Sequence, residues 1–417
     1  MTDDTGRTER KLDKAWLSAG ALPRLIAVLD RDGEQARVVG GAVRNALLDI
    51  PISEIDVATT APPEEVVRRV QAAGFKAVPT GIKHGTITVV VNGHPFEVTT
   101  LREDVETYGR HAKVAFGRDW RTDAERRDFT MNALSASADG TIYDYVGGLA
   151  DLAERRVRFI GDPQKRIAED YLRILRFFRF HAAYGTSEHP YAEGLAACIA
   201  GRDGLDQLSR ERVRMEVMKL VVAPHAVPTL IAMADAGLLL RVIGGVGYLG
   251  AFEMMAKVED AIGLAPDPAR RLGALALAVI EDAERLWQRL RLTNHERERL
   301  ASMAEDWWRV RPGNEQAARA LLYRLGPEKF TDRVLLAWAH ASAGAQDRDW
   351  HAMASLPQRW SAPAFPLRAA DFLARGLEKG PALGAAMAAA EAAWIEAGFP
   401  ADDAAMAAIA DAIIQNV

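Results

Sequence analysis

The strongest constraint on the fold of this chain is a change in sequence pattern near Pro163. Up to about Leu149, β-branched runs alternate with turn signals. Beyond Pro163, strand patterns nearly vanish, and Leu, Ala, Arg and Glu recur at helical spacing as far as Val417. Apolar residues three and four positions apart favour helices, whereas period-two runs favour strands. The sequence therefore predicts an α+β fold, with a small mixed-sheet head followed by an all-helical remainder.

Length and charge restrict the class of protein further. The chain has 417 residues, of which 49% are hydrophobic, and 52 Lys and Arg stand against 57 Asp and Glu. This length is too great for one hydrophobic core, so we expect several domains. The net charge of −5 argues against non-specific binding of nucleic acid by overall charge. It does not exclude a local basic track.

Cysteine content and hydropathy indicate the compartment. The single cysteine, Cys198, excludes a disulfide framework and a cysteine-based zinc site, and we expect it to be a buried thiol. No apolar run approaches the length that spans a membrane, and the polar segment MTDDTGRTERKLDK does not fit a signal peptide. We therefore expect a cytoplasmic protein with no membrane partner.

Local patterns in the head predict three features. A strand at 37–39 leads into Gly40-Gly41, and a helix begins at Ala42. Two β-rich runs, 86–91 and 94–100, flank Asn92-Gly93, the dipeptide best suited to a tight hairpin turn. Residues 103–125 are charged and lack periodicity, so we expect a mobile loop there.

Three carboxylates are candidate ligands of a divalent cation. Glu54 and Asp56 alternate with aliphatic residues, so a strand would place both on one face. Glu97, on the second strand of the predicted hairpin, would add a third carboxylate. Carboxylates on adjacent strands suit Mg²⁺, which prefers oxygen ligands and shares them with substrate phosphates. Each short motif alone is more simply explained as a solvated acidic face or a turn.

A row of charged residues follows in the helical part. Asp170, Arg173, Arg176 and Arg179 step by three, so on a helix they would be neighbours in a winding row. Such a row could offer Asp170 and Arg173 to a base edge, and the other two arginines to a phosphate chain. The simpler alternative is a helix that buries Leu172, Leu175, Phe177 and Phe180 and leaves its arginines solvated.

Two further patterns narrow the choice. Asp144-Tyr145-Val146-Gly147-Gly148 alone is simply a turn. The nine histidines show no metal-ligand spacing, and no His-Asp dipeptide occurs. A helical metal-dependent phosphohydrolase domain is therefore unsupported.

The ordered set of motifs resembles the class II tRNA nucleotidyltransferase and bacterial poly(A) polymerase family, within the polymerase β superfamily. The resemblance runs from Val38 to about Leu220. It is carried by 40–56, 97–102, 126–134, 144–148, 169–179 and 209–216. Segments 365–367 and 379–384, with Asp371, resemble tail segments of some members more weakly. The family organisation implies a nucleotidyltransferase head at 1–150, a helical neck at 151–222, and a helical body and tail at 223–417 that binds tRNA.

The resemblance also implies roles for individual residues. Glu54 and Asp56 would hold Mg²⁺, with Glu97 as a third carboxylate. Asp170 and Arg173 would read CTP and ATP without a template, and the segment 209–216 would buttress the nucleotide pocket. The positions that match nucleotide-binding residues of the family are Gly41, Arg44, Arg127, Asp128, Asn132, Asp170, Arg173, Arg176 and Arg179.

The implied activity is template-independent addition of CCA to the tRNA 3′ end from CTP and ATP, with release of pyrophosphate and no protein partner required. Addition of CC or A alone, or poly(A) synthesis, are the alternatives within the family. The full-length segment 102–125 favours complete addition. One departure from the family pattern bears on activity, since Glu54 stands where the pattern has Asp. Asn45 also replaces an Asp of the pattern, which is a milder change. A catalytically impaired tRNA-binding homologue is therefore the rival hypothesis.

Overall fold

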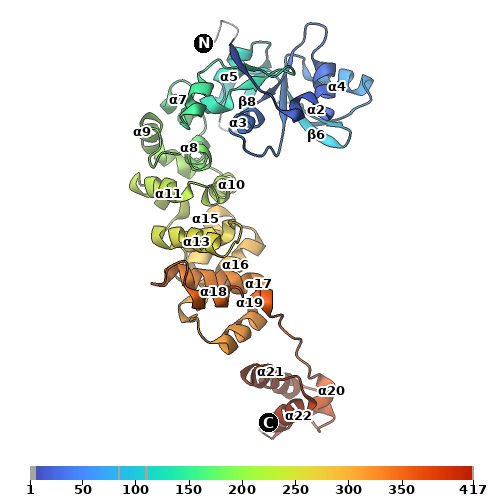
Figure 1. Cartoon of the computed structure of the whole chain (residues 1–417), viewed down its shortest axis with the longest axis vertical. Coiled ribbons are helices and arrows are strands. Elements are labelled where there is room, and N and C mark those ends of the chain that lie inside the picture. The colour runs from blue at the N-terminus through green and yellow to red at the C-terminus, as the bar shows by residue number, and fades with distance from the viewer. Residues whose placement is uncertain (1–5, 83–84, 109–110, 416–417) are drawn as a thin grey trace. The chain divides into compact units, whose positions relative to one another are not determined.

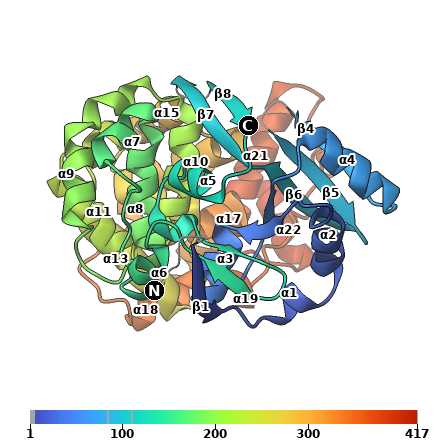
Figure 2. The same cartoon turned by 90° about the horizontal axis from the view of Figure 1, so that it is seen from above.

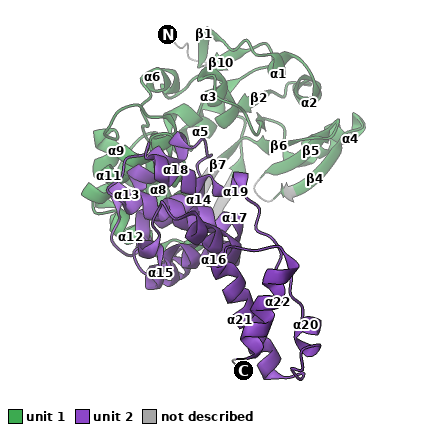
Figure 3. Cartoon of the chain, turned by 60° about the horizontal axis from the view of Figure 1, so that its bottom comes forward, with its two compact units in different colours: residues 1–242 green, residues 243–417 purple. Residues whose placement is uncertain are grey.

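The structure is a computed structural model that describes residues 6–82, 85–108 and 111–415. The chain forms two compact units, Met1–Val242 (unit 1) and Ile243–Val417 (unit 2), which Figure 3 shows in different colours. In the described part of the chain, every strand lies in unit 1 and unit 2 is helical. The α+β fold predicted from the sequence is confirmed.

Unit 1 begins with a mixed sheet of eight strands in the order β1-β10-β9-β2-β3-β6-β5-β4. Neighbouring strands are antiparallel except β3 and β6, which are parallel. The helices α2 and α4 pack against each other and against β5, and Figure 2 shows both beside strands β4 to β6. The strands of this sheet are β1 (Arg7–Lys11), β2 (Ala36–Val39), β3 (Asp56–Thr59), β4 (Lys76–Gly81), β5 (Thr86–Val91), β6 (His94–Thr100), β9 (Ser135–Ala136) and β10 (Thr141–Tyr143).

The predicted hairpin at 86–100 is confirmed. β5 and β6 pair antiparallel, with Val91 opposite His94 across the two-residue turn. Asn92 and Gly93 both have positive φ, 52° and 82°, which is the backbone that a tight turn of this hand requires. Ile87, Val89 and Val91 alternate into the core, so one face of the hairpin is buried.

The prediction of a mobile loop at 103–125 is wrong for the described residues of this segment. Strands β7 (Arg102–Tyr108) and β8 (His111–Phe116) pair antiparallel, and helix α5 (Trp120–Glu125) follows, capped by Asp119. Within the described residues these two strands pair only with each other. Main-chain groups supply the ladder hydrogen bonds of a two-stranded ribbon whatever its side chains are, so such a ribbon can form without the hydrophobic alternation typical of a strand in a packed sheet.

The helices of unit 1 fall into two groups, one around the sheet and one after it, the latter shown in green in Figure 1. The first group is α1 (Ala15–Ser18), α2 (Ala21–Leu29), α3 (Gly41–Leu47), α4 (Pro63–Ala72), α5, the short 3-10 helix η2 (Thr130–Asn132) and α6 (Gly148–Ala153). The second is α7 (Pro163–Glu169), α8 (Leu172–Tyr184), α9 (Ala192–Ala200), η3 (Arg202–Gln207), α10 (Arg210–Val221), α11 (Ala226–Asp235) and α12 (Leu239–Ile243), which spans the boundary of the units. Cys198 on α9 is buried as predicted, and burial raises the pKa of its thiol.

Unit 2 is built from helices alone in the described residues. They are α13 (Leu249–Ala261), α14 (Pro268–Ala276), α15 (Ile280–Leu290), α16 (Asn294–Ala304), η4 (Trp307–Arg309), α17 (Glu315–His340), α18 (Arg348–Ala354), α19 (Leu356–Arg359), α20 (Ala369–Leu373), α21 (Pro381–Glu396) and α22 (Asp403–Ile414). Helix α17 kinks at Gly326, which precedes Pro327.

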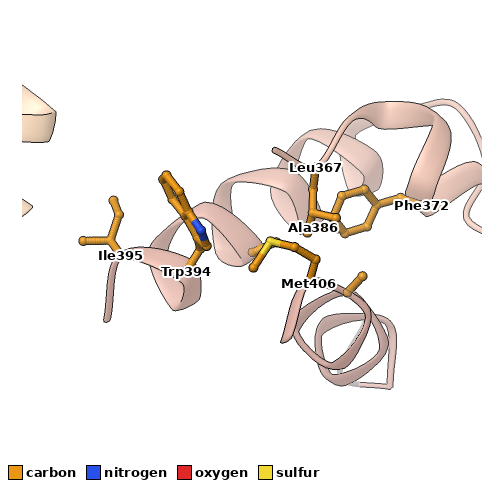
Figure 4. Packing of buried hydrophobic residues seen from close by; sticks show 8 residues of the cluster. Leu367, Phe372, Ala386, Trp394, Ile395 and Met406 are labelled. Carbon is orange, nitrogen blue, oxygen red and sulfur yellow. The ribbon is translucent and has the colours of Figure 1, made fainter. Parts of the chain in front are cut away.

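The last three helices share a core of their own. Phe372, Ala386, Trp394 and Met406 are buried together, and Tyr323 of α17 packs against the cluster. Figure 4 shows the Met406 side chain of α22 beside α21. Within the described residues, no helix combines the length and apolar character needed to cross a membrane.

Candidate active site

Two carboxylates meet at the centre of the sheet. Asp56 is the first residue of β3, and Glu97 on β6 is its register partner in the parallel pair. Paired residues of adjacent strands are on the same face, about 4.8 Å apart along the sheet. Loss of hydration and then the negative charge of Glu97 raise the pKa of Asp56, and Glu54 adds to the rise while Arg127 opposes it. The site therefore concentrates negative charge, which is the condition that attracts a divalent cation.

Glu54 is placed differently from the sequence prediction. The strand begins at Asp56, so Glu54 lies in the irregular segment before it and strand alternation does not fix its direction. Its charge still reaches Asp56. Among the described residues, no group of three or more Asp, Glu, His or Cys side chains is arranged to hold a metal. Asp56 and Glu97 therefore offer two oxygen donors side by side, and Glu54 lies near them without completing a three-ligand cluster.

The Gly40-Gly41 pair lies at the end of β2, where α3 begins. Gly40 has a φ of 68°, and a Cβ there would approach Arg127 Nη1 to 3.2 Å, which is tighter than ordinary contact. A Cβ on Gly41 would lie 3.6 Å from Arg44 Nη2. Glycine is therefore favoured at Gly40 by its positive φ and by the approach of Arg127, whereas the contact at Gly41 is an ordinary one.

A chain of polar contacts then runs from the head to α8. Arg44 donates to the Asn132 side-chain oxygen, and Asn132 Nδ2 donates to Asp128 Oδ1 at 3.0 Å. Asp128 Oδ2 accepts from Arg176 Nε at 2.7 Å and Nη2 at 2.5 Å. Burial alone would raise the pKa of Asp128, but Arg176 and Asn132 hold it below its usual value. The fold thus brings four predicted nucleotide-binding residues into one network, in which Arg44 and Asn132 alone are 88 positions apart.

Aromatic packing holds this network in place. Phe129 lies 4.9 Å from Phe159 and 5.1 Å from Phe180 of α8, measured between ring centroids. The Arg44 guanidinium lies over the Tyr184 ring at 4.1 Å, and its Nη2 donates to the Tyr184 hydroxyl at 2.6 Å. Buried aromatic pairs combine area with preferred geometry, so α8 is fixed against the segment 126–134.

The row at 170–179 departs from the predicted single helix. α7 ends at Glu169 and α8 begins at Leu172, so Asp170 lies between the two helices and its Oδ1 accepts from the Leu172 backbone N–H at 3.1 Å. Arg173 donates to Glu169 and to the Arg166 carbonyl oxygen, not to Asp170. The expectation that Asp170 and Arg173 are neighbours on one helix is wrong, because Asp170 adopts extended backbone at the end of α7.

The remaining arginines of the row are paired, not solvated. Arg179 Nε donates to Glu216 of α10, and Arg176 Nη1 lies 3.7 Å from Glu216 Oε1. Leu172, Leu175, Phe177 and Phe180 are buried. The simpler alternative is therefore right that these apolar residues are buried. It is wrong that the arginines are solvated.

Sequence reasoning missed Asp123. This residue of α5 is only 3% exposed and accepts from both Arg126 and Arg127, with Arg127 Nη2 at 3.1 Å. Burial alone would raise its pKa, but the two arginines hold it below the usual value. Its position four residues before Arg127 is the helical spacing that could have identified it. The segment 144–148 forms the predicted turn, in which the Asp144 carboxylate accepts hydrogen bonds from the backbone N–H groups of residues 146–149, at the start of α6.

We predict that Asp123→Asn weakens nucleotide binding and stability together. Without this charge, Arg126 and Arg127 lose the carboxylate that they share, so we expect a loss of about 2 kcal/mol in unfolding free energy and a rise of about tenfold in KM for CTP. Thermal melting and steady-state kinetics measure both. Glu125→Gln, an exposed position on the same helix, is the control; equal effects of the two variants would contradict a positioning role for Asp123.

Comparisons with known proteins identify the family of this chain. Residues 36–158 match the family model described as Poly A polymerase head domain, and residues 193–244 match the model described as Probable RNA and SrmB- binding site of polymerase A. The chain is 33% identical to the mitochondrial CCA tRNA nucleotidyltransferase 1 of Mus musculus over 91% of this chain and 87% of the relative. It is 30% identical to the CCA-adding enzyme of Limosilactobacillus fermentum over 87% of this chain and 89% of that one.

Solved structures show the same fold. The crystal structure of the Bacillus stearothermophilus CCA-adding enzyme in complex with CTP superposes with a TM-score of 0.71 at 27% identity, over 90% of this chain and 92% of that chain. Fold and site thus define a nucleotidyltransferase with a poly(A) polymerase-type head. More narrowly, the chain belongs to the family of CCA-adding tRNA nucleotidyltransferases.

Proposed function

We propose that this protein adds C, C and A in turn to the 3′ end of tRNA, using CTP and ATP and releasing pyrophosphate. The observation that carries the proposal is the paired carboxylates of Asp56 and Glu97 in the same unit as the Asp128-centred arginine network. In each step the terminal 3′-oxygen of the RNA would form a bond to the α-phosphorus of the nucleotide. The bond from that phosphorus to the pyrophosphate oxygen would break, and the hydroxyl proton would leave to solvent.

A divalent cation, proposed as Mg²⁺, suits the carboxylate site. Hard oxygen donors with mutually repelling charges, as at Asp56 and Glu97, are the ligands that this ion prefers. Asp56 and Glu54 would hold it, with Glu97 as the further carboxylate. When bound, such an ion lowers the pKa of an attacking hydroxyl and stabilises charge on the leaving oxygen.

The nucleotide would be bound by side chains of the head and of α8. Gly41 would let a triphosphate approach the backbone, and Arg44 and Arg127, whose guanidinium groups lie close to Gly41 and Gly40, would bind the phosphates. Asp128 and Asn132 would lie near the sugar. Arg176 and Arg179 would contact the nucleotide after releasing part of their present pairing, and Asp170 and Arg173 would read the base edge.

We assign these parts to a head at 1–150, a neck at 151–222 and a body and tail at 223–417. The helical body and tail would hold the tRNA acceptor arm by shape and backbone contacts, as proteins commonly do with double-stranded RNA. A cytoplasmic location stays a prediction from the sequence, and the animal relatives are named as mitochondrial.

Incorporation into a tRNA that ends before CCA tests this function against its alternatives. We expect two CMP additions with CTP alone, and completion by one AMP when CTP and ATP are supplied together. Addition of AMP only, arrest after CC with both nucleotides, or growth of an A-tract would each identify a different activity and refute the proposal. The full-length segment 102–125, of which the structure describes β7, β8 and α5, favours complete addition.

The second candidate is a tRNA-binding homologue that has lost catalysis because Glu54 replaces Asp. It predicts tRNA binding without CMP transfer at any Mg²⁺ or Mn²⁺ concentration, and recovery of transfer in Glu54→Asp. We expect instead that the unmodified protein is active and that Glu54→Asp changes kcat by less than about tenfold, or ~1.4 kcal/mol. The reason is that Glu54 lies outside the strand, where its longer side chain can adjust its reach.

A further inference from the structure

A cavity of about 650 Å³ lies inside unit 2 and contains none of the residues proposed for catalysis. Its walls come from the segment 305–314, from α17 and from α18, and Figure 1 shows these two helices side by side. Arg324 precedes the kink of α17 at Gly326 and Arg333 follows it, and both line the cavity. Sites for small molecules measure roughly 300–1,000 Å³. The cavity therefore has the size of a ligand site.

One part of the cavity wall is apolar. Ala317, Ala320 and Leu321 are three and four positions apart on α17, so they share one face of the helix. Val310 and Met353 add further aliphatic groups to the wall. A ring that covers such a surface is stabilised because apolar area on both sides leaves water. The apolar wall therefore suits the ring of a ligand.

The other part of the wall carries an excess of positive charge. Four arginines line the cavity against two carboxylates, and these residues are Arg309, Arg311, Arg324, Arg333, Glu305 and Asp306. Glu305 accepts from Arg333, which is only 5% exposed, at 2.8 Å. Asp306 lies 3.5 Å from Arg309. The two carboxylates are thus balanced by two of the arginines, and two positive charges remain.

These two charges belong to Arg311 and Arg324, which have no carboxylate partner within the described residues. Arg311 Nη1 donates to the backbone oxygens of Trp308 and Val310, at 2.6 and 2.8 Å. Arg324 forms no hydrogen bond or ion pair within residues 6–82, 85–108 and 111–415. Both side chains are exposed and available to a ligand. A guanidinium group binds phosphate through two parallel hydrogen bonds, so the pair favours a phosphorylated ligand.

We propose that this cavity binds a free nucleoside polyphosphate, with its ring against α17 and its phosphates between Arg311 and Arg324. The inference goes beyond the proposed function, since the ligand is held by unit 2 alone. Phosphates on the outside of an RNA helix would pair with the arginines but leave the apolar wall uncovered. A nucleotide fills both parts of the cavity.

Equilibrium dialysis of the full-length protein against labelled GDP tests the site. GDP is the probe because the head is proposed to read cytosine and adenine, so guanine separates the two sites. The test variant is Arg311→Gln combined with Arg324→Gln. Arg319→Gln is the matched control, since Arg319 lies on the same half of α17, pairs with Glu315 and does not line the cavity. Arg44→Gln shows whether GDP binds in the head instead, and thermal melting verifies that each variant is folded.

We expect one GDP per chain, and binding weaker by about tenfold or more in the double variant. Arg319→Gln and Arg44→Gln should bind GDP as the unmodified protein does, and inorganic pyrophosphate or guanosine alone should compete less well than unlabelled GDP. If the double variant does not fold, Arg324→Gln alone decides.

Three results would overturn the inference: no saturable binding, loss of binding in Arg44→Gln but not in the double variant, or equal competition by pyrophosphate. A double variant that binds tRNA more weakly but GDP normally would also overturn it, because the arginines would then contact RNA. Failure of the unmodified protein to add C or A would refute the proposed function and leave the GDP result unchanged.

Discussion

Asp56→Asn should abolish nucleotidyl transfer while leaving the protein folded and able to bind tRNA. Asp56 begins β3 beside Glu97, and its carboxylate is proposed to hold the divalent cation. A metal ion contributes several kcal/mol of charge stabilisation in such reactions. At ~1.36 kcal/mol per tenfold, we expect kcat to fall by about 10³-fold or more. Single-turnover incorporation of labelled CMP measures the loss.

The stability of the same variant separates catalysis from folding. The pKa of Asp56 is raised, first by lost hydration and then by the charge of Glu97. A carboxyl group whose pKa is raised on folding contributes stability below its unfolded pKa, and that contribution disappears as the pH rises through the folded pKa. At neutral pH the Asp56 charge therefore destabilises the fold, and Asp56→Asn should melt at an equal or higher temperature than the unmodified protein.

Asp30→Asn is the matched control, because Asp30 is an exposed carboxylate at the end of α2 in the same unit. We expect it to retain activity and melting temperature. Retention of more than about a tenth of the transfer rate in Asp56→Asn, with melting unchanged, would show that this carboxylate does not hold the reacting metal. A large drop in melting temperature would contradict the charge repulsion inferred at the site.

The local elements of this fold were predictable because their causes are local. The Asn92-Gly93 turn, the strands on either side of it and the apolar face of α8 depend on residues a few positions apart. Such patterns are visible in a single sequence.

The pairings that shape the site were not predictable, because they join residues distant in sequence. Arg176 reaches Asp128 across 48 positions, and Arg212 reaches Asp170 across 42. Taken alone in the sequence, each of these four residues is equally compatible with a solvated surface position. Only the packing of α8 and α10 onto the head decides which charges meet. The break in the helix between Glu169 and Leu172 was likewise hidden, since every residue there is acceptable within a helix.

Unit 2 contains the most deeply buried charge pairs, and we expect them to control its stability. Asp332 on α17 is fully enclosed and accepts from Arg270 Nε at 3.1 Å and from Arg299 Nε at 2.7 Å. Arg270 also donates to Glu259 on α13 at 2.9 Å. The contacts join α13, α14, α16 and α17 through side chains whose charges nearly balance. Burial alone would lower the pKa of Arg299, yet hydrogen bonds and charge from Asp332 raise it.

We predict that Asp332→Ala lowers the unfolding free energy of unit 2 by about 3–5 kcal/mol, the typical cost of leaving a buried charge without its partner. Arg270 would keep Glu259 and Arg299 would keep Asp267, but the buried Nε donors of both arginines would lose their acceptor. Urea denaturation followed by tryptophan fluorescence measures the loss, because all nine tryptophans except Trp16 and Trp120 lie in unit 2.

Glu328→Gln provides the comparison for this variant, since Glu328 lies one turn earlier on α17, is half exposed and approaches Arg299 only to 3.6 Å. Exposed ion pairs contribute about 0–1 kcal/mol, so we expect a change within that range. A similar loss in both variants would mean that net charge near Arg299, not the buried pairing, stabilises the helices. A small effect of Asp332→Ala alone would mean that water enters and solvates the two guanidinium groups, and that the four helices are held by their apolar contacts instead.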